Sequence, residues 1–290
     1  MPIKQYMNPN ALVENLKSKG VIITNKEKTI NIVKKYSYYS IVNCYKEVFK
    51  CGKNYRKRVS FNEIYSLYIF DKNLRYIFLK YILEIENILK SQISEILSSQ
   101  YGVKEYLIID NFDERIDSSI INTIIEKINM EIHNQIGKHE AITHYYLKYG
   151  FIPPFVLTKI LSFGDLSRLY SILKQSDRQS VSKVFKISDK LLKQIMKNIT
   201  LVRNICAHND RLFCFRSKFF LPLKEISYNN QVTNIYQIKK SMEIILGKSG
   251  SITFNLLIDK EIKKLSKRLK SISIDNILYL MGFTQWIIFK

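Results

Sequence analysis

The stretch from Asp71 to Tyr101, DKNLRYIFLKYILEIENILKSQISEILSSQY, decides the fold class. Its apolar residues recur at steps of three and four, a spacing that places them on one face of a helix. These residues are Leu74, Ile77, Phe78, Tyr81, Ile82, Ile85, Ile88, Leu89 and Ile93. Gly102 follows directly and suits the end of a helix, because glycine easily adopts the left-handed conformation found there. The pattern predicts one long amphipathic central helix.

Helical patterns also dominate the rest of the chain. Ser60-Phe61-Asn62-Glu63 is a capping box, and Ser188 can cap a helix that starts at Asp189 and runs to about Arg211. Further helices are predicted over 10–19, from 24 or 25 to 36, over 117–136 and, as several short ones, over 155–185. The chain of 290 residues has only 9 Gly and 5 Pro, too few for the many turns of a β-sandwich or barrel. We therefore expect an all-α protein that forms a single unit over 1–290, with an N-terminal lobe (1–150) and a second lobe (151–290).

Net charge is the strongest compositional signal. The chain has 46 Lys and Arg against 25 Asp and Glu, which gives a formal net charge of +21. Positive side chains in such excess repel one another, which favours a polyanionic partner, either nucleic acid or an anionic membrane surface. A lysine-rich composition without any partner is the plainer alternative, since most lysine runs are solvated faces.

The cysteines and the N-terminal residues bear on the cellular compartment. Cys44, Cys51, Cys206 and Cys214 include no C-x-x-C pair, so they match neither a disulfide framework nor a common zinc site. Residues 1–16 lack the apolar core of a signal peptide. No uncharged apolar run reaches the roughly 18 residues that span a bilayer. The sequence predicts a soluble, cytoplasmic protein without a metal or cofactor.

The stretch Leu201–Arg211, LVRNICAHNDR, contains the residues best suited to chemistry. On a continuous helix, Asn204 and His208 lie on one face, and Arg211 follows three residues after His208. Arg203 is rotated from His208 by about 140° around an ideal helix and therefore flanks that face. One copy gives an incomplete site in this geometry, whereas two copies packed across a symmetry axis could converge on one pocket.

These groups suit cleavage of RNA without a metal, in which the 2′-hydroxyl of the RNA attacks the adjacent phosphate. His208 is predicted to act as general acid or base, because imidazole titrates near neutral pH. Arg203 can stabilise the developing phosphorane charge, and Asn204 can orient the imidazole or bind phosphate. Two other interpretations stay open: a histidine with a purely structural role, and a metal site of Cys206, His208 and Cys214, although that spacing is unlike zinc sites.

Two clusters of basic residues are candidates for RNA binding, and Arg211 is a further candidate beside the motif. The first cluster, in a predicted loop, is Lys53, Arg56, Lys57 and Arg58, with Tyr55 available to stack on an unpaired base. The second cluster is Lys260, Lys263, Lys264, Lys267, Arg268 and Lys270. It surrounds an aliphatic stripe of Ile258, Ile262, Leu265, Leu269 and Ile272 on one predicted helix. Such a helix could lie on a membrane surface, but the stripe is explained more simply as a core-facing side.

Five blocks of sequence, in order, resemble bacterial abortive-infection (Abi) proteins of the HEPN superfamily. The block R-N-x-x-A-H-N-x-R-L at Arg203–Leu212 resembles their signature most directly. The others are LKSKGVII at Leu16–Ile23 with Tyr38 and Tyr39, FDKNLR at Phe70–Arg75 with Glu84 and Glu86, PFVLTKILSFGDLSRLY at Pro154–Tyr170, and MGFTQW at Met281–Trp286. The chain differs from many relatives at two positions, with Asn209 in place of a second histidine and Lys90 in place of an arginine.

The resemblance implies an all-α, HEPN-type helical bundle with an additional helical lobe. It also implies an R-x-x-x-x-H ribonuclease site of Arg203, Asn204 and His208, usually at the interface of a homodimer. Family members act as toxins in phage defence, and some bind a structured noncoding RNA. The leading hypothesis is therefore a metal-independent endoribonuclease regulated by such an RNA. The alternative is an RNA-binding protein that recognises RNA through the same site without cutting it.

Overall fold

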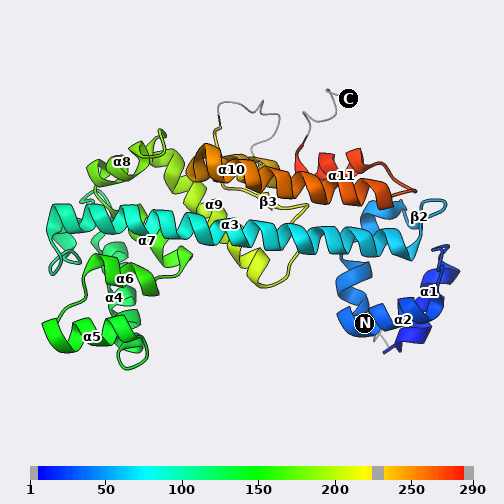
Figure 1. Cartoon of the computed structure of the whole chain (residues 1–290), viewed down its shortest axis with the longest axis horizontal. Helices are drawn as coiled ribbons and strands as arrows, with labels where there is room; N and C mark the ends of the chain where they lie inside the picture. Colours follow the sequence, from blue (N-terminus) through cyan, green and yellow to red (C-terminus); the bar gives the residue numbers. More distant parts are fainter. Residues whose placement is uncertain (1–5, 224–231, 284–290) are drawn as a thin grey trace.

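The fold was analysed on a computed structural model of the chain, which describes residues 6–223 and 232–283 (Figure 1). The longer helices are α1 (Pro9–Ser18), α2 (Lys26–Tyr36), α3 (Phe61–Tyr101), α4 (Ser118–Gln135), α5 (Glu140–Tyr149), α6 (Pro154–Ile160), α7 (Phe163–Ile172), α8 (Gln175–Lys183), α9 (Asp189–Ala207), α10 (Ile235–Arg268) and α11 (Ile274–Met281). Short turns of π- or 3₁₀-helix lie at Tyr39–Asn43, Lys46–Phe49 and Ile109–Asn111. Two antiparallel pairs of two-residue strands, β1 (Lys50–Cys51) with β2 (Asn54–Tyr55) and β3 (Arg216–Ser217) with β4 (Thr233–Asn234), complete the described part. The all-α prediction is confirmed.

Helix α3 runs through the whole molecule (Figure 1). Its 41 residues correspond to a length of about 60 Å at 1.5 Å per residue. The predicted capping box is present: the Glu63 amide donates to Ser60 Oγ, and the Ser60 amide donates to Glu63 Oε2 at 3.0 Å. Gly102, with φ of +75°, ends the helix as expected. The two helical segments predicted from Ser60 and from Asp71 therefore form one unbroken helix.

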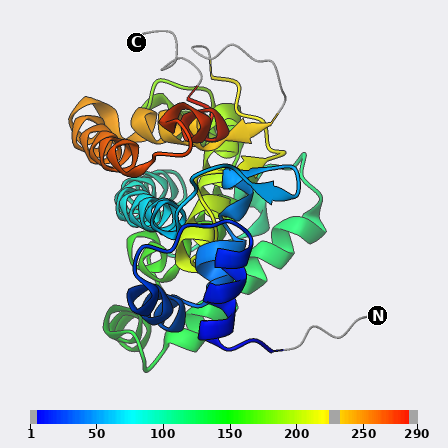
Figure 2. The same ribbon diagram turned by 90° about the vertical axis from the view of Figure 1, so that its right-hand side faces the viewer.

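Helix α10 lies antiparallel beside α3 (Figures 1 and 2). The Phe254 ring packs on Phe78 and Tyr81, with centroids 5.4 and 4.8 Å apart. Towards the other end, Asn73 Nδ2 donates to Glu261 at 2.8 Å, and Glu63 Oε1 accepts from the Lys270 amide at 2.7 Å. These contacts show that α10 and the residues that follow it run in the direction opposite to α3. At Gly247, with φ of +68°, α10 is kinked.

The C-terminal aliphatic stripe is buried, as its spacing predicts. All five members are at most 7% exposed: Ile258, Ile262, Leu265, Leu269 and Ile272. The stripe therefore faces the core, which removes the observation behind the membrane-surface alternative. The expected single helix ends at Arg268, however, so Leu269, Lys270 and Ile272 lie beyond it. The Glu63 carboxylate holds this continuation by accepting from the amides of Lys270 and Ser271.

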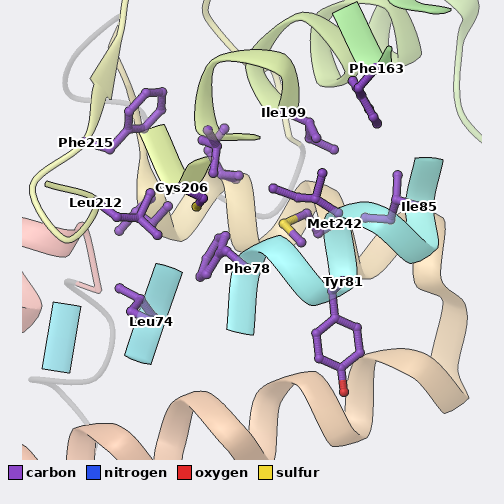
Figure 3. Packing of buried hydrophobic residues seen from close by; sticks show 14 of the residues in the cluster. Leu74, Phe78, Tyr81, Ile85, Phe163, Ile199, Cys206, Leu212, Phe215 and Met242 are labelled. Atoms are coloured by element: carbon purple, nitrogen blue, oxygen red, sulfur yellow. The ribbon is translucent and has the colours of Figure 1, made fainter. Parts of the chain in front are cut away.

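Helix α9 completes the core with α3 and α10. Figure 3 shows Leu74, Phe78 and Ile85 of α3 gathered with Ile199 and Cys206 of α9, and with Met242 of α10. All of these side chains belong to one buried cluster. The predicted cap of α9 is confirmed, since Ser188 Oγ accepts from the Leu191 amide at 3.2 Å.

The remaining helices gather at the two ends of α3. Helices α1 and α2 lie near its N-terminal end, and α4 to α7 lie near its C-terminal end (Figure 1). The division into lobes at residue 150 stays a prediction, and Thr284–Trp286 of the C-terminal block lie outside the described residues. Within the described part of the chain, no helix has the length and apolarity to cross a membrane.

Candidate active site

The end of α9 is set by Asn209. This residue adopts the left-handed conformation, with φ of +58°, which asparagine tolerates better than most other residues. The Asp210 amide then donates back to the Ile205 carbonyl at 3.0 Å, the bond that closes a Schellman motif. The helix therefore stops at Ala207, and the prediction that it runs to about Arg211 is wrong.

Of the three predicted catalytic residues, Arg203 and Asn204 lie on the last two turns of α9, and His208 is the residue that follows its last turn. Asn204 and His208 are both exposed, and the His208 amide donates to the Asn204 carbonyl at 2.9 Å, so both lie on one face as expected. Arg203 is half-buried, and its Nε is buried without a hydrogen-bond partner among the described residues. The exposed end of α9 thus presents an imidazole and an amide to solvent, with a partly covered guanidinium beside them.

Arg211 lies past the helix rather than on the face that contains His208. Its side chain is exposed, and its Nη1 donates to the Cys44 carbonyl at 2.7 Å. The expected continuation of the polar face from His208 to Arg211 is therefore wrong, because the left-handed residue turns the chain away. Arg211 instead links the end of the motif to the N-terminal part of the fold.

A buried ion pair on α3 holds the chain just after the motif. Asp71 and Arg75, four residues apart, are 0% and 2% exposed, and Arg75 Nη1 lies 2.7 Å from Asp71 Oδ2. The Asp71 carboxylate also accepts from the amides of Leu212, at 3.2 Å, and Phe213, at 2.7 Å. The same guanidinium donates to the Asp210 carbonyl at 3.2 Å. The pair therefore fixes the backbone that leaves α9.

Tyr45 completes this network. Its hydroxyl donates to Asp71 Oδ2 at 2.7 Å, and its ring stacks on Phe213 with centroids 5.9 Å apart. Burial raises the pKa of Tyr45 well above its ordinary value, and the Asp71 carboxylate acts in the same direction. The phenol therefore stays protonated and remains a hydrogen-bond donor. Sequence reasoning missed this network. The only signal for it was an Asp and an Arg one helical turn apart among the apolar residues of the predicted central helix.

We expect Asp71→Asn to destabilise the protein strongly. Removing one partner leaves the buried Arg75 charge uncompensated, which costs about 3–5 kcal/mol in comparable sites. The melting temperature, measured by circular dichroism, should fall by at least roughly 5 °C. The matched control is Glu14→Gln, which removes the carboxylate of the exposed Lys26–Glu14 pair and should leave the melting temperature nearly unchanged. An equal, small effect in both variants would contradict this role of Asp71.

The cysteines near the motif are positioned as core residues. Cys206 is buried and points toward α3 (Figure 3), and burial raises its pKa to about 12. Burial also raises the pKa of Cys214. Both thiols are therefore protonated at neutral pH, whereas a metal ligand must be a thiolate. Over residues 6–223 and 232–283, no three His, Cys, Asp or Glu side chains are placed to hold a metal ion.

Both predicted basic clusters lie around the N-terminal end of α3. Lys53, Arg56, Lys57 and Arg58 are all exposed, in the β1–β2 hairpin and the turn after it rather than in a plain loop. Lys260, Lys263, Lys264, Lys267, Arg268 and Lys270 are also exposed. The clusters are neighbours because Ser60 and Glu63 begin α3 directly after the first cluster, while Glu63 binds the backbone of Lys270 in the second.

Tyr55 and Lys264 are partly engaged within the protein. The Tyr55 ring is half-buried, with the Lys50 ammonium 6.0 Å from its centroid, and burial raises its pKa above the ordinary value. Lys264 forms an ion pair with Glu261 at 2.5 Å. All the basic side chains of the two clusters are nevertheless exposed.

The fold and the site together define an all-α protein with an Arg-Asn-His cluster at the end of an anchored helix. A protein-family model described as Abi-like protein matches residues 31–214, which is 184 of the 290 residues and includes the whole motif. The chain belongs to the Abi-like family, and this membership points to abortive infection, a form of phage defence. No curated protein and no solved structure matches the chain significantly.

Proposed function

We propose that this protein is a metal-independent endoribonuclease of the HEPN type that acts as a toxin in phage defence. The observation that supports it best is the exposed Asn204–His208 face with Arg203 beside it, inside the region matched by the Abi-like family. The buried Asp71–Arg75 pair favours this assignment, because catalytic groups need a rigid support.

The proposed reaction uses the RNA as its own nucleophile. His208 takes the proton from the 2′-hydroxyl, whose oxygen then bonds to the adjacent phosphorus. Arg203 stabilises the charge of the phosphorane, and Asn204 orients the imidazole or the phosphate. The bond from phosphorus to the 5′-oxygen breaks, and that oxygen takes a proton from the imidazolium of His208, which returns the histidine to its neutral form. The products are a 2′,3′-cyclic phosphate and a 5′-hydroxyl.

RNA is the proposed partner for the two basic clusters as well. The net charge of +21 exceeds what one catalytic site needs, and both clusters are exposed at the same end of α3. Lysines and arginines in such clusters contact phosphates and position an RNA without reading its sequence. A structured noncoding RNA held at this surface is the proposed regulator.

The second candidate function is RNA recognition without cleavage. It is favoured by one specific observation: Asn209, at the position where the resemblance to Abi proteins implies a second histidine, has a left-handed backbone that serves to end α9. In this alternative, Arg203, Asn204 and His208 bind a phosphate or base. Turnover alone separates the two candidates.

The test is incubation of the purified protein with a single-stranded RNA in the presence of EDTA. We expect cleavage at an undiminished rate, because no step uses a metal ion. The His208→Ala protein, prepared in parallel, controls for contaminating nucleases. RNA that is bound but intact would favour the alternative, and cleavage abolished by EDTA would contradict the proposed chemistry.

A further inference from the structure

A groove of about 1400 Å³ lies at the opposite end of α9 from the predicted active site. It is lined by the first turns of α9, including Leu191 and Gln194, by the end of α8, by the chain after β3 and by the start of α10. Lys190, at the groove, precedes His208 by 18 residues, which corresponds to about 27 Å along the helix axis. One helix therefore connects the groove to the motif.

The groove is strongly basic. Six lysines line it, from three separate segments: Lys183, Lys186, Lys190, Lys193, Lys218 and Lys240. Among the described lining residues the single acidic one is Glu243, and Lys239 and Lys240 already pair with it at 2.5 and 3.2 Å. Partial burial lowers the pKa of Lys193, and the nearby charges of Arg178 and Lys197 act in the same direction. The groove thus has an excess of positive charge, which a bound anion would neutralise.

The wall formed by the chain after β3 is held rigidly. The Phe219 carbonyl accepts from Asn198 Nδ2 at 2.8 Å and from Thr233 Oγ1 at 2.9 Å, and the Leu221 amide donates to Thr233 Oγ1 at 3.0 Å. The Lys197 ammonium lies 3.8 Å from the centroid of the Phe219 ring. The groove is therefore a formed feature of the fold, and its aromatic and aliphatic lining lies next to its lysines.

Gln194 adds a polar amide group to the lining of the groove. This residue lines the groove, and its Oε1 is buried without a hydrogen-bond partner in the described part of the chain. If the side chain turns toward a ligand, its amide oxygen accepts from a base amino group or a ribose 2′-hydroxyl, and its Nε2 can donate to a phosphate. A flat membrane surface does not enter a groove. Lysines, an aromatic ring and an acceptor together fit a single strand of nucleic acid.

We propose that this groove binds a single-stranded segment of RNA, with its lysines on the phosphates and Gln194 on a base or a 2′-hydroxyl. The inference rests on the proposed function, since it assumes that RNA is the ligand, and it adds a second binding site about one helix length from the motif. RNA that occupies both sites is positioned by the groove, so loss of the groove weakens binding while the chemical step is retained.

The test is a salt titration of RNA binding with the full-length His208→Ala protein. The probe is a fluorescent oligouridylate of about 20 nucleotides, longer than a typical single-strand site. The groove variant replaces Lys183, Lys186, Lys190 and Lys218 with Gln. The matched control replaces four exposed lysines of the α1–α2 end, Lys17, Lys19, Lys28 and Lys34, with Gln and so removes the same charge. Thermal unfolding checks that both variants fold.

We expect the slope of log affinity against log salt to become less negative by about 3 in the groove variant, since each of the four single-strand contacts contributes about −0.7. The control variant should keep the parental slope. Gln194→Leu should reduce the preference for RNA over DNA of the same length, with little change in slope. Replacing Lys263, Lys264, Lys267 and Arg268 with Gln in the same titration measures the second basic cluster separately.

Three other outcomes would each rule out the groove as an RNA site or the proposed function. Equal slopes in the groove and control variants would refute the groove while leaving RNA binding intact. A groove variant that loses binding to polyglutamate but not to RNA would assign the groove to an acidic protein. If the parental protein binds no RNA at all, the proposed function itself fails.

Discussion

His208→Ala is expected to abolish RNA cleavage and the toxicity of the protein in cells. A general acid or base contributes about 10²–10⁴-fold to such reactions, so the residual rate should fall to the level of the background. Arg203→Ala should reduce the rate by about 10²–10³-fold, because it removes a group that stabilises the transition-state charge. Cleavage of a labelled RNA under single-turnover conditions measures both effects.

The fold should tolerate the His208 substitution. His208 is exposed, and substitutions at exposed positions usually change stability by no more than about 0.5 kcal/mol. His133→Ala, which removes an exposed histidine from α4, is the matched control and should cut RNA normally. Full activity in His208→Ala would contradict the assigned site, whereas loss of activity in both variants would point to an indirect effect.

Cleavage is expected to require a homodimer that pairs the ends of two α9 helices. Arg203 is half-buried and lies about 140° from the exposed His208 around an ideal helix, so one copy does not converge these groups on a single phosphate. The rate per protomer should therefore fall on dilution, in step with the dimer fraction measured by mass photometry. A monomer that cleaves at the full rate at nanomolar concentration would contradict this requirement.

Mixing the Arg203→Ala and His208→Ala proteins identifies the layout of the dimeric site. If each site takes its arginine and its histidine from different subunits, one of the two sites in a mixed dimer keeps both groups. Random pairing makes half of the dimers mixed, so roughly a quarter of the wild-type activity should return. If each subunit supplies its own pair, none returns. Each protein alone provides the inactive reference.

Local sequence patterns were sufficient to predict several of the helices, whereas α5, α11 and the first half of α10 were not predicted. The capping box at Ser60–Glu63, the steps of three and four along α3 and the cap at Ser188 depend on residues that are near each other in the chain. The end of α9 was not predictable in the same way, because the period of the helix continues past the point where it stops. The left-handed backbone of Asn209 determines where the helix ends, and asparagine is only one of several residues that occur at such ends.

Two features depend on contacts between distant segments of the chain: the Asp71 network that supports the predicted active site, and the basic groove. Asp71 meets Leu212 across 141 positions, and nothing local in either stretch reveals that partner. The groove collects lysines from α8–α9, from the chain after β3 and from α10, none of which forms a conspicuous basic run. The two basic clusters selected from the sequence are conspicuous because their charges are consecutive or share one helix face.

In the proposed reaction the 2′-hydroxyl of the RNA is the nucleophile, and His208 and Arg203 assist it. Analysis of the ends of the RNA fragments produced by wild-type protein in EDTA tests it most directly. We expect a 2′,3′-cyclic phosphate and a 5′-hydroxyl, and an RNA with a 2′-deoxy nucleotide at the cleaved position should resist cutting there. Fragments with 5′-phosphates, or cleavage next to the deoxy nucleotide at an unchanged rate, would contradict it.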